Sequence, residues 1–395
     1  MQNTKPQKLI LTLMIGASAL AIVGLAVFFY LNDDSGNVRG QSRAHRFEEL
    51  IDIVESRFIG EFDIDEFVDS AMRAAVASLD DDWSHFMTQE EYALHLESVE
   101  NQFVGIGVQV LSDEETKDIR VLYVYRNSGA YDAGIRAGDI IAQVDGESVM
   151  GFTLEELRTL LQRPIDDTAL ISIIREGSVL EVNVVYRVVF ADPVSFEMIY
   201  GNIGYVSLRN FDAGAADSFI YAVEYLMEMG AVAFIYDVRS NPGGRLNEMS
   251  AILDFLLPEG VIFISVTNQG QEHTIMSDEY YIDMPAVVLV NSNSFSAAEY
   301  FAALLSEYDY AYTVGEQTTG KSRLQSTIPL AGGGAITLST GEYLTKNRVS
   351  LYDIGGFTPQ FLIEISDDRY FFLIRNEPDS STDHQLAKAL SLLTN

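Results

Sequence analysis

The chain begins with an apolar run and then changes to patterns typical of helices and strands. Residues 9–31 carry no charged side chain, and these 23 residues would span about 34 Å as a helix, enough to cross a bilayer. Lys5 and Lys8 precede the run and two aspartates follow it. The positive-inside rule therefore predicts a single transmembrane anchor, with residues 1–8 in the cytoplasm and the rest of the chain extracytoplasmic. A cleaved signal peptide is the alternative, although its apolar core is usually only about 7–15 residues long.

Changes in the hydrophobic period divide the rest of the chain. Residues 32–43 are mostly polar and predict a linker, whereas residues 44–89 carry apolar side chains at helical spacing and predict an N-terminal helical segment. Residues 90–189 alternate as short strands around one amphipathic helix, which predicts a small mixed domain. In residues 190–395 apolar strands alternate with helices, and a last helix closes the chain. This order predicts an α/β domain with a mostly parallel sheet, within a multidomain α+β fold.

The composition narrows the classes of function. The 395 residues include 58 acidic and 25 basic side chains, a net charge of −33, so we expect no surface that neutralises nucleic-acid phosphates. The chain contains no Cys, which excludes disulfides, thiolate metal sites and a Cys nucleophile. Its five His are scattered, with no pair at metal-ligand spacing. We therefore expect no metal site, no cofactor and no nucleic-acid partner.

A glycine-bearing loop follows one of the apolar strands. The segment Asp237 to Gly244 has the sequence D-V-R-S-N-P-G-G. Consecutive N–H groups at Gly243 and Gly244, placed at the carboxyl end of a strand, are candidate donors to a developing oxyanion. An ordinary Pro-Gly turn without a function is the alternative.

A serine stands where an alanine-rich helix is predicted to begin. Ser296 follows the apolar strand that ends at Val290 and directly precedes Ala297. At a helix N-terminus the dipole favours negative charge, which suits a nucleophile whose attack creates an oxyanion. Ser296 and Glu299 also fit the capping box S-x-x-E, in which the serine only caps the helix.

The segment from Gly315 to Ser322, G-E-Q-T-T-G-K-S, fits the P-loop pattern G-x-x-x-x-G-K-[ST]. A P-loop needs a helix that starts at the Lys-Ser pair. The alternating residues 323–330 with Pro329 instead predict a strand and a hairpin, which argues against nucleotide binding. Lys321 is then a candidate general base, provided that burial lowers its pKa. An ordinary turn lysine is the alternative.

Together these three segments resemble the C-terminal processing peptidases, also called tail-specific proteases, which have a Ser/Lys dyad. Lys321 lies 25 residues after Ser296 and Gln325 four residues further, as in that family, and its N-P-G-G loop stands at residues 241–244. The sequence departs from the family pattern at four positions. These are Phe295, Ala298, Thr319 and Ser322.

The small mixed domain resembles a PDZ domain of the circularly permuted bacterial type, over residues 90–189. Gly105-Ile106-Gly107-Val108 matches the carboxylate-binding loop, and an A-G-I-R-A-G-D turn and an amphipathic helix follow in order. Exposed N–H groups beside a strand edge can capture a terminal carboxylate while the peptide adds as a strand. A glycine bulge without a ligand is the alternative.

The resemblance implies a membrane-anchored, extracytoplasmic serine endopeptidase. Its substrates would be polypeptides with accessible, apolar C-termini. Whether the chain forms a homo-oligomer is left open. The implied catalytic residues are Ser296 as nucleophile, Lys321 as base and Gln325 as the residue that orients the lysine. The implied backbone donors are those of Gly243, Gly244 and Ala297 for the oxyanion, and the loop Val104, Gly105, Ile106 and Gly107 for the C-terminal carboxylate. A peptide-binding scaffold without activity and a P-loop NTPase are the rival hypotheses.

Overall fold

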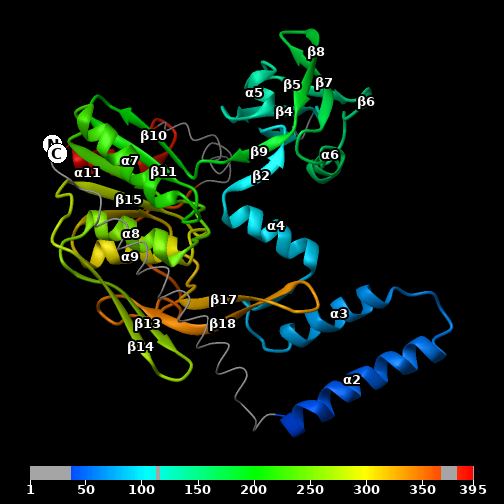
Figure 1. Cartoon of the computed structure of the whole chain (residues 1–395). Helices are drawn as coiled ribbons and strands as arrows, with labels where there is room; N and C mark the ends of the chain where they lie inside the picture. Colours follow the sequence, from blue (N-terminus) through cyan, green and yellow to red (C-terminus); the bar gives the residue numbers. More distant parts are fainter. Residues whose placement is uncertain (1–36, 113–115, 366–379, 395) are drawn as a thin grey trace, which may run out of the picture. The chain divides into compact units, whose positions relative to one another are not determined.

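The computed structural model describes residues 37–112, 116–365 and 380–394 (Figure 1). The chain divides into two compact units, residues 1–70 and 71–395. Within the described ranges no helix is both long and apolar enough to cross a membrane, and the predicted anchor at residues 9–31 lies outside them. The first helices are α2 (Asn37–Arg57), α3 (Ile64–Ala77) and α4 (Gln89–Val99).

The small mixed domain is an antiparallel sheet with two short helices. Its strands are β2 (Gln102–Gly105), β3 (Val108–Ser112), β4 (Ile119–Val124), β5 (Ile140–Val144), β6 (Glu147–Ser148), β7 (Thr168–Arg175), β8 (Ser178–Val185) and β9 (Arg187–Phe190). The helices are α5 (Gly129–Asp132) and α6 (Leu154–Leu160). The sheet order is β3-β4-β5-β7-β8 with β6 beside β5, whereas β2 pairs with β9. Helix α6 begins at a capping box, in which Thr153 and Glu156 exchange hydrogen bonds.

The larger domain contains two sheets. The strands of the central sheet, in spatial order, are β10 (Val194–Ile199), β11 (Ile203–Leu208), β12 (Ala233–Asp237), β15 (Ala286–Val290), β16 (Ala311–Gly315) and β19 (Phe361–Leu362). The second sheet has the order β1 (His85–Met87), β18 (Ala335–Leu344), β13 (Gly260–Thr267) and β14 (Glu272–Ser277), with β17 (Arg323–Pro329) also paired to β18. The helices are α7 (Ala215–Glu228), α8 (Leu246–Leu256), α9 (Ala297–Glu307) and α11 (His384–Leu393).

The prediction of a mostly parallel sheet for this domain was wrong, because the sheets are mixed. In the central sheet β11, β12, β15, β16 and β19 run parallel and β10 runs antiparallel. All pairings in the second sheet are antiparallel. An apolar run such as Val261 to Val266 predicts a strand but carries no information about the direction of its partner.

The central sheet is covered on both faces, as Figure 1 shows. Alternate residues of one strand therefore enter different cores: Phe234 and Tyr236 of β12 pack with α7, α8 and α9, whereas Ile235 packs with α11. Every residue of β12 and β15 is buried. Continuous apolar strands are typical of parallel strands that lie between two helical layers.

The parallel strands bring the predicted motifs to one edge of the sheet. The loop after β12 leads to α8, the loop after β15 leads to α9, and the loop after β16 leads to β17. Because these strands are neighbours and parallel, their carboxyl ends lie side by side. This edge is where open α/β sheets bind ligands.

Candidate active site

The three loops enclose one cavity of about 570 Å³ at the carboxyl ends of the strands. Its lining includes all six residues predicted for catalysis and for the oxyanion, namely Ser296, Lys321, Gln325, Gly243, Gly244 and Ala297. Apolar side chains of α8 and of the second sheet form another part of the wall, including Met249, Phe263 and Leu324. The cavity thus combines a hydroxyl, an amine and backbone donors with an apolar wall, which suits a polypeptide ligand.

Ser296 occupies a strained position at the start of α9. Its φ is +57°, a value that few residues other than glycine adopt and that is frequent at functional sites. Gly243 packs directly against it. A Cβ at Gly243 would lie 2.8 Å from Ser296 Cβ and 2.9 Å from the Ala297 nitrogen, so this approach of the two loops requires glycine.

A buried carboxylate joins the serine loop to the lysine loop. Glu299 has no exposed surface, and its Oε1 accepts the N–H groups of Ser296 at 2.9 Å and Lys321 at 2.6 Å. Its Oε2 accepts the Gly320 N–H at 2.8 Å and the Thr318 hydroxyl at 2.7 Å. Burial raises the Glu299 pKa, against the lowering effect of these hydrogen bonds. The carboxylate half of the predicted capping box is present, because Glu299 accepts the Ser296 N–H, but Glu299 also fixes the Lys321 backbone, which the capping-box pattern does not indicate.

The amine of Lys321 is partly buried and lies against aromatic rings. Burial lowers the pKa of Lys321, although Glu299 and Asp81 act in the opposite direction. The Nζ atom is 4.4 Å from the centre of the Trp83 ring and 5.6 Å from that of Phe295. Neither the sequence pattern nor the spacing singled out Trp83.

The described residues contain no hydrogen bond from Lys321 Nζ to the Ser296 hydroxyl or to Gln325. The Gln325 side chain instead donates to the Ser339 hydroxyl at 3.3 Å, across the β17–β18 pair. The structure therefore brings these three residues into one cavity without joining their side chains.

Asn241 shapes the loop that holds the predicted oxyanion donors. Its side-chain oxygen accepts the Gly243 N–H at 2.8 Å, and its amide donates to the Leu208 carbonyl at 2.8 Å. The Asn241 carbonyl accepts the N–H of Phe295 at 3.2 Å. One of the predicted oxyanion donors, Gly243, is thus already used inside the loop.

Tyr343 of β18 contributes to the cavity from the second sheet. Its hydroxyl donates to the carbonyl of Lys321, and burial raises its pKa well above the usual value of 10.0. No local pattern marked Tyr343, because its position depends on the pairing of β18 with strands distant in the sequence.

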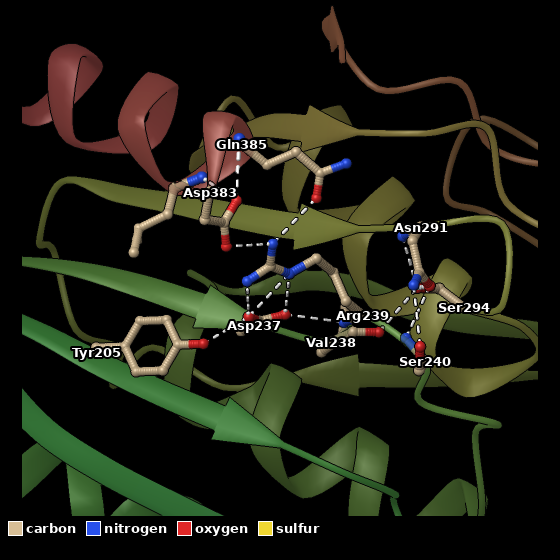
Figure 2. Close-up of polar contacts among 10 residues, drawn as sticks. Tyr205, Asp237, Val238, Arg239, Ser240, Asn291, Ser294, Asp383 and Gln385 are labelled. Carbon is tan, nitrogen blue, oxygen red and sulfur yellow. Dashed lines mark hydrogen bonds and ion pairs between the residues drawn. The ribbon is translucent and has the colours of Figure 1, made fainter. Parts of the chain in front are cut away.

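A buried ion network lies at the end of β12, where the loop that carries Gly243 and Gly244 begins (Figure 2). Arg239 bonds Asp237 at the end of β12 and reaches Asp383 at 2.7 Å and Gln385 at 3.1 Å in the last helix. The Tyr205 hydroxyl donates to Asp237 at 2.6 Å. The neighbouring carboxylates raise the pKa of Arg239 despite its burial. The network ties the helix that closes the chain to the strand end that bears the loop.

A second set of polar contacts holds the two loops together beside this network. The Asn291 side chain accepts the N–H of Ser240 at 2.7 Å and donates to the Ser240 hydroxyl at 2.9 Å. The Ser294 hydroxyl donates to the Val238 carbonyl at 2.8 Å. The small polar residues before Ser296 therefore attach its loop to the loop that follows β12 (Figure 2).

The candidate peptide groove is a cavity of about 750 Å³ in the small domain. The four predicted residues Val104, Gly105, Ile106 and Gly107 line it, together with Leu154, Leu157 and Leu161 in and beside α6. Inside the loop, the Ile106 carbonyl accepts the Ala130 N–H at 2.9 Å and the Gly107 carbonyl accepts the Tyr125 N–H at 3.0 Å. A Cβ at Gly107, whose φ is +84°, would lie 2.0 Å from that of Ser128, so only glycine fits there.

The structure does not favour nucleotide binding at the G-E-Q-T-T-G-K-S loop. Residues after Lys321 form strand β17, as the alternating pattern predicted, and no helix starts at Ser322. The Ser322 hydroxyl is buried and donates to the Tyr343 carbonyl at 2.8 Å. The loop thus lacks the helix N-terminus that holds phosphates in a P-loop.

Comparison with known proteins agrees with these features. Residues 202–363 match the model of peptidase family S41, and residues 120–175 match that of the PDZ domain. The chain is 28% identical to the carboxy-terminal processing protease CtpA of Bacillus subtilis, over 91% of this chain and 77% of that protein. It is 29% identical to the carboxyl-terminal-processing protease of Synechocystis, over 82% and 76%. An S41 protease structure from Bacteroides fragilis shares the fold, with a TM-score of 0.59 at 19% identity over 82% of this chain and 90% of that one.

Proposed function

We propose that this chain, a serine peptidase of family S41 with a PDZ domain, is an endopeptidase that selects polypeptides by their C-terminus and uses Ser296 as nucleophile and Lys321 as general base. One observation carries this proposal. Ser296 and Lys321 line the same cavity, and the buried carboxylate of Glu299 holds the backbone N–H of both residues. Nucleophile and base are therefore kept in a fixed backbone relation.

In the proposed mechanism the neutral Lys321 amine takes the hydroxyl proton as Ser296 Oγ attacks a peptide carbonyl. The tetrahedral oxyanion accepts hydrogen bonds from the backbone N–H groups of Gly244 and Ala297, and from that of Gly243 once it leaves the Asn241 side chain. The ammonium then gives its proton to the leaving amine, and the acyl-enzyme remains. Water hydrolyses the ester with Lys321 again as the base, which restores the Ser296 hydroxyl.

The environment of Lys321 supports its role as base. A lysine is protonated at neutral pH unless its surroundings disfavour the charge, and burial lowers the Lys321 pKa. Gln325 lies on the same wall and bonds Ser339, so its proposed role in orienting the amine requires that the Gln325 side chain turn toward Lys321. The non-catalytic scaffold is not favoured, because nucleophile, base and backbone donors share one cavity.

The small domain is proposed to capture the substrate's terminal carboxylate with the N–H groups of the Val104–Gly107 loop. Strand β3 is at the edge of its sheet, so a peptide can add beside it as a further strand. Leu154, Leu157 and Leu161 form the opposite wall. This wall favours an apolar side chain at the peptide's C-terminus.

The anchor and the location of the enzyme belong to the same proposal. The charge-free run at residues 9–31 and the lysines before it support one transmembrane helix with both domains outside the cytoplasm. The expected substrates are then extracytoplasmic polypeptides with free, apolar C-termini.

The decisive experiment compares cleavage of an unfolded peptide with an apolar C-terminus by the wild type, Ser296→Ala and Lys321→Ala. Both variants should lose cleavage, by at least about 1,000-fold in kcat. Ser292→Ala is the matched control, because Ser292 is exposed in the same loop, and it should cleave normally. Normal turnover by Ser296→Ala would falsify the proposed nucleophile.

A further inference from the structure

Two aromatic side chains surround the amine of the candidate base, and the proposed mechanism does not use them. Trp83 and Phe295 have ring centres 5.8 Å apart with planes inclined at 32°. The Nζ of Lys321 lies 4.4 Å from the first ring centre and 5.6 Å from the second. Both separations are within the range in which a cation is attracted to the face of an aromatic ring.

The first ring is held in place by the second sheet. Strand β1 starts two residues after Trp83 and pairs with β18 through Phe86 and Ile336. The Ser84 hydroxyl accepts the Ser339 N–H at 3.1 Å and donates to the Asp81 carboxylate. The turn that carries Trp83 is therefore fixed to the strand opposite Gln325.

The second ring belongs to the nucleophile loop. Phe295 directly precedes Ser296, and its N–H donates to the Asn241 carbonyl at 3.2 Å. The two rings thus come from separate segments of the chain, the turn before β1 and the loop before α9, and meet at one lysine side chain. In the described residues this amine forms no hydrogen bond with the Ser296 hydroxyl.

We propose that Trp83 and Phe295 form an aromatic clamp that holds the amine of Lys321 in its protonated form away from Ser296, so that the two rings set how readily the base becomes available. The inference rests on the proposed role of Lys321 as base. Aromatic faces attract the ammonium and not the neutral amine. Release of the amine toward the hydroxyl therefore accompanies loss of its proton.

Other charged or titratable side chains also act on this amine or line its cavity. They are Asp81 in the turn before β1, His95 on α4, Asp212 before α7, Arg245 before α8, Glu299 and Tyr300 on α9, Arg323 on β17 and Tyr343 on β18. Burial raises the pKa of Asp212 to about 6 and that of Tyr300 well above 10.0, so Asp212 is ionised and Tyr300 neutral at the alkaline pH where Lys321 loses its proton. Glu299 and Asp81 favour the ammonium, as the rings do, whereas burial opposes it. Burial lowers the pKa of His95 below its usual 6.5 and raises that of Tyr343 well above 10.0. Neither of these two side chains therefore changes charge between neutral pH and pH 10.

The first experiment detects the aromatic clamp by fluorescence and does not depend on peptidase activity. Trp83 is the only tryptophan of the chain, so fluorescence excited where the 20 tyrosines absorb little reports its surroundings. Comparison with Lys321→Met removes the contribution of tyrosine ionisation, because both proteins contain the same tyrosines. A pH titration of the emission should show a transition below the usual lysine pKa of about 10.4 in the wild type that is missing in Lys321→Met. Identical titrations of the two proteins would overturn the clamp, whether or not the chain is a peptidase.

The second arm measures the pH dependence of kcat/KM. Trp83→Leu removes a ring face and should move the acidic limb to lower pH by about 0.4–1.5 units. Phe295→Ala should move it in the same direction, and Trp83→Phe should restore most of the wild-type profile. An active Trp83→Leu or Phe295→Ala enzyme with an unmoved limb, or with a limb at higher pH, would overturn the inference and leave the dyad intact.

A matched control tests whether the loss of any aromatic–lysine contact has the same effects. Lys388 lies 4.2 Å from the centre of the Phe361 ring, and neither residue lines the catalytic cavity. Phe361→Leu should leave both the emission titration and the acidic limb unchanged. If Trp83→Leu does not fold, Phe295→Ala still tests the direction of the shift.

Discussion

The candidate catalytic cavity and the candidate peptide groove are built on different principles. In the candidate catalytic cavity polar contacts fix the backbone of the proposed reactive groups, and the buried Glu299 accepts the N–H groups of both Ser296 and Lys321. The groove has an edge strand, a glycine-bearing loop and leucines as its wall. Chemistry requires fixed geometry, whereas recognition of an extended peptide requires an open edge. Substitutions in the cavity should therefore alter kcat, whereas substitutions in the groove should alter KM.

Outside the proposed dyad, the largest effect is expected from Glu299→Gln. The Gln amide has the size of the Glu299 carboxylate, but only one of its two terminal atoms can accept a hydrogen bond. The charge-assisted hydrogen bonds from the backbone N–H groups to Glu299 are therefore lost. We expect kcat to fall by about 100–1,000-fold, while binding of a labelled peptide in fluorescence anisotropy stays unchanged. Glu316→Gln is the control, because Glu316 also accepts N–H groups, from Ser292 and Ile365, but does not line the cavity. Equal losses in the two variants would mean that Glu299 has no special link to the dyad.

The next largest effect is expected from Gly243→Ala, which should lower kcat by about 100-fold. The added Cβ meets Ser296 Cβ at 2.8 Å, so the nucleophile must shift. Gly230→Ala is matched to it, since Gly230 has a similar φ of +97° but nothing within 4 Å of an added Cβ. Thermal unfolding should show comparable backbone strain in both variants. Only Gly243→Ala should lose turnover, and a comparable loss in Gly230→Ala would contradict the proposed contact.

Amidation of the substrate's C-terminus tests the groove alone. It removes the charge that the Val104–Gly107 loop is proposed to bind, and a charge-assisted hydrogen bond contributes about 1.5–3 kcal/mol. KM should rise by about 10–100-fold with little change in kcat. Steady-state kinetics with a pair of otherwise identical peptides gives the answer. If both peptides have the same KM, the PDZ domain does not select by the terminal carboxylate.

The smallest expected effect is on the pH dependence of kcat/KM and of stability. Because the neutral Lys321 amine is the proposed base and its pKa is lowered by burial, kcat/KM should rise with pH and level off below the usual lysine pKa of about 10.4. The same lowered pKa makes the ammonium costly in the folded state. The contribution of Lys321 to stability is therefore present at alkaline pH and is lost as the pH falls through the folded-state pKa. A kcat/KM profile without this limb would exclude Lys321 as the base.

The sequence predicted the parts of the site that follow local rules. Ser296, Lys321 and the Gly243–Gly244 loop stand at strand ends, where spacing and residue type carry the signal, and the structure places them in one cavity. The assigned roles of these residues stay predictions until kinetics tests them. The strand after Lys321 was predicted correctly from alternation around Pro329, and this strand argues against the P-loop.

The rest of the site depends on contacts between distant segments. Trp83 reaches Lys321 because β1 pairs with β18, and Tyr343 is held in its place because β18 also pairs with the distant strand β13. Nothing in the local pattern of either residue indicates these partners. The second sheet was missed for the same reason, since an apolar strand such as β13 does not encode whether its neighbour is parallel or antiparallel.

The central claim is that Ser296 is activated by Lys321. Intact-mass analysis after incubation with a fluorophosphonate tests it most directly, because the serine hydroxyl displaces fluoride from phosphorus and the probe therefore reads nucleophilicity without a substrate. The account predicts one adduct on the wild type, mapped to Ser296, none on Ser296→Ala, and phosphonylation of Lys321→Met slower by at least about 100-fold. Wild-type phosphonylation rates in Lys321→Met, or an adduct on Ser296→Ala, would contradict it.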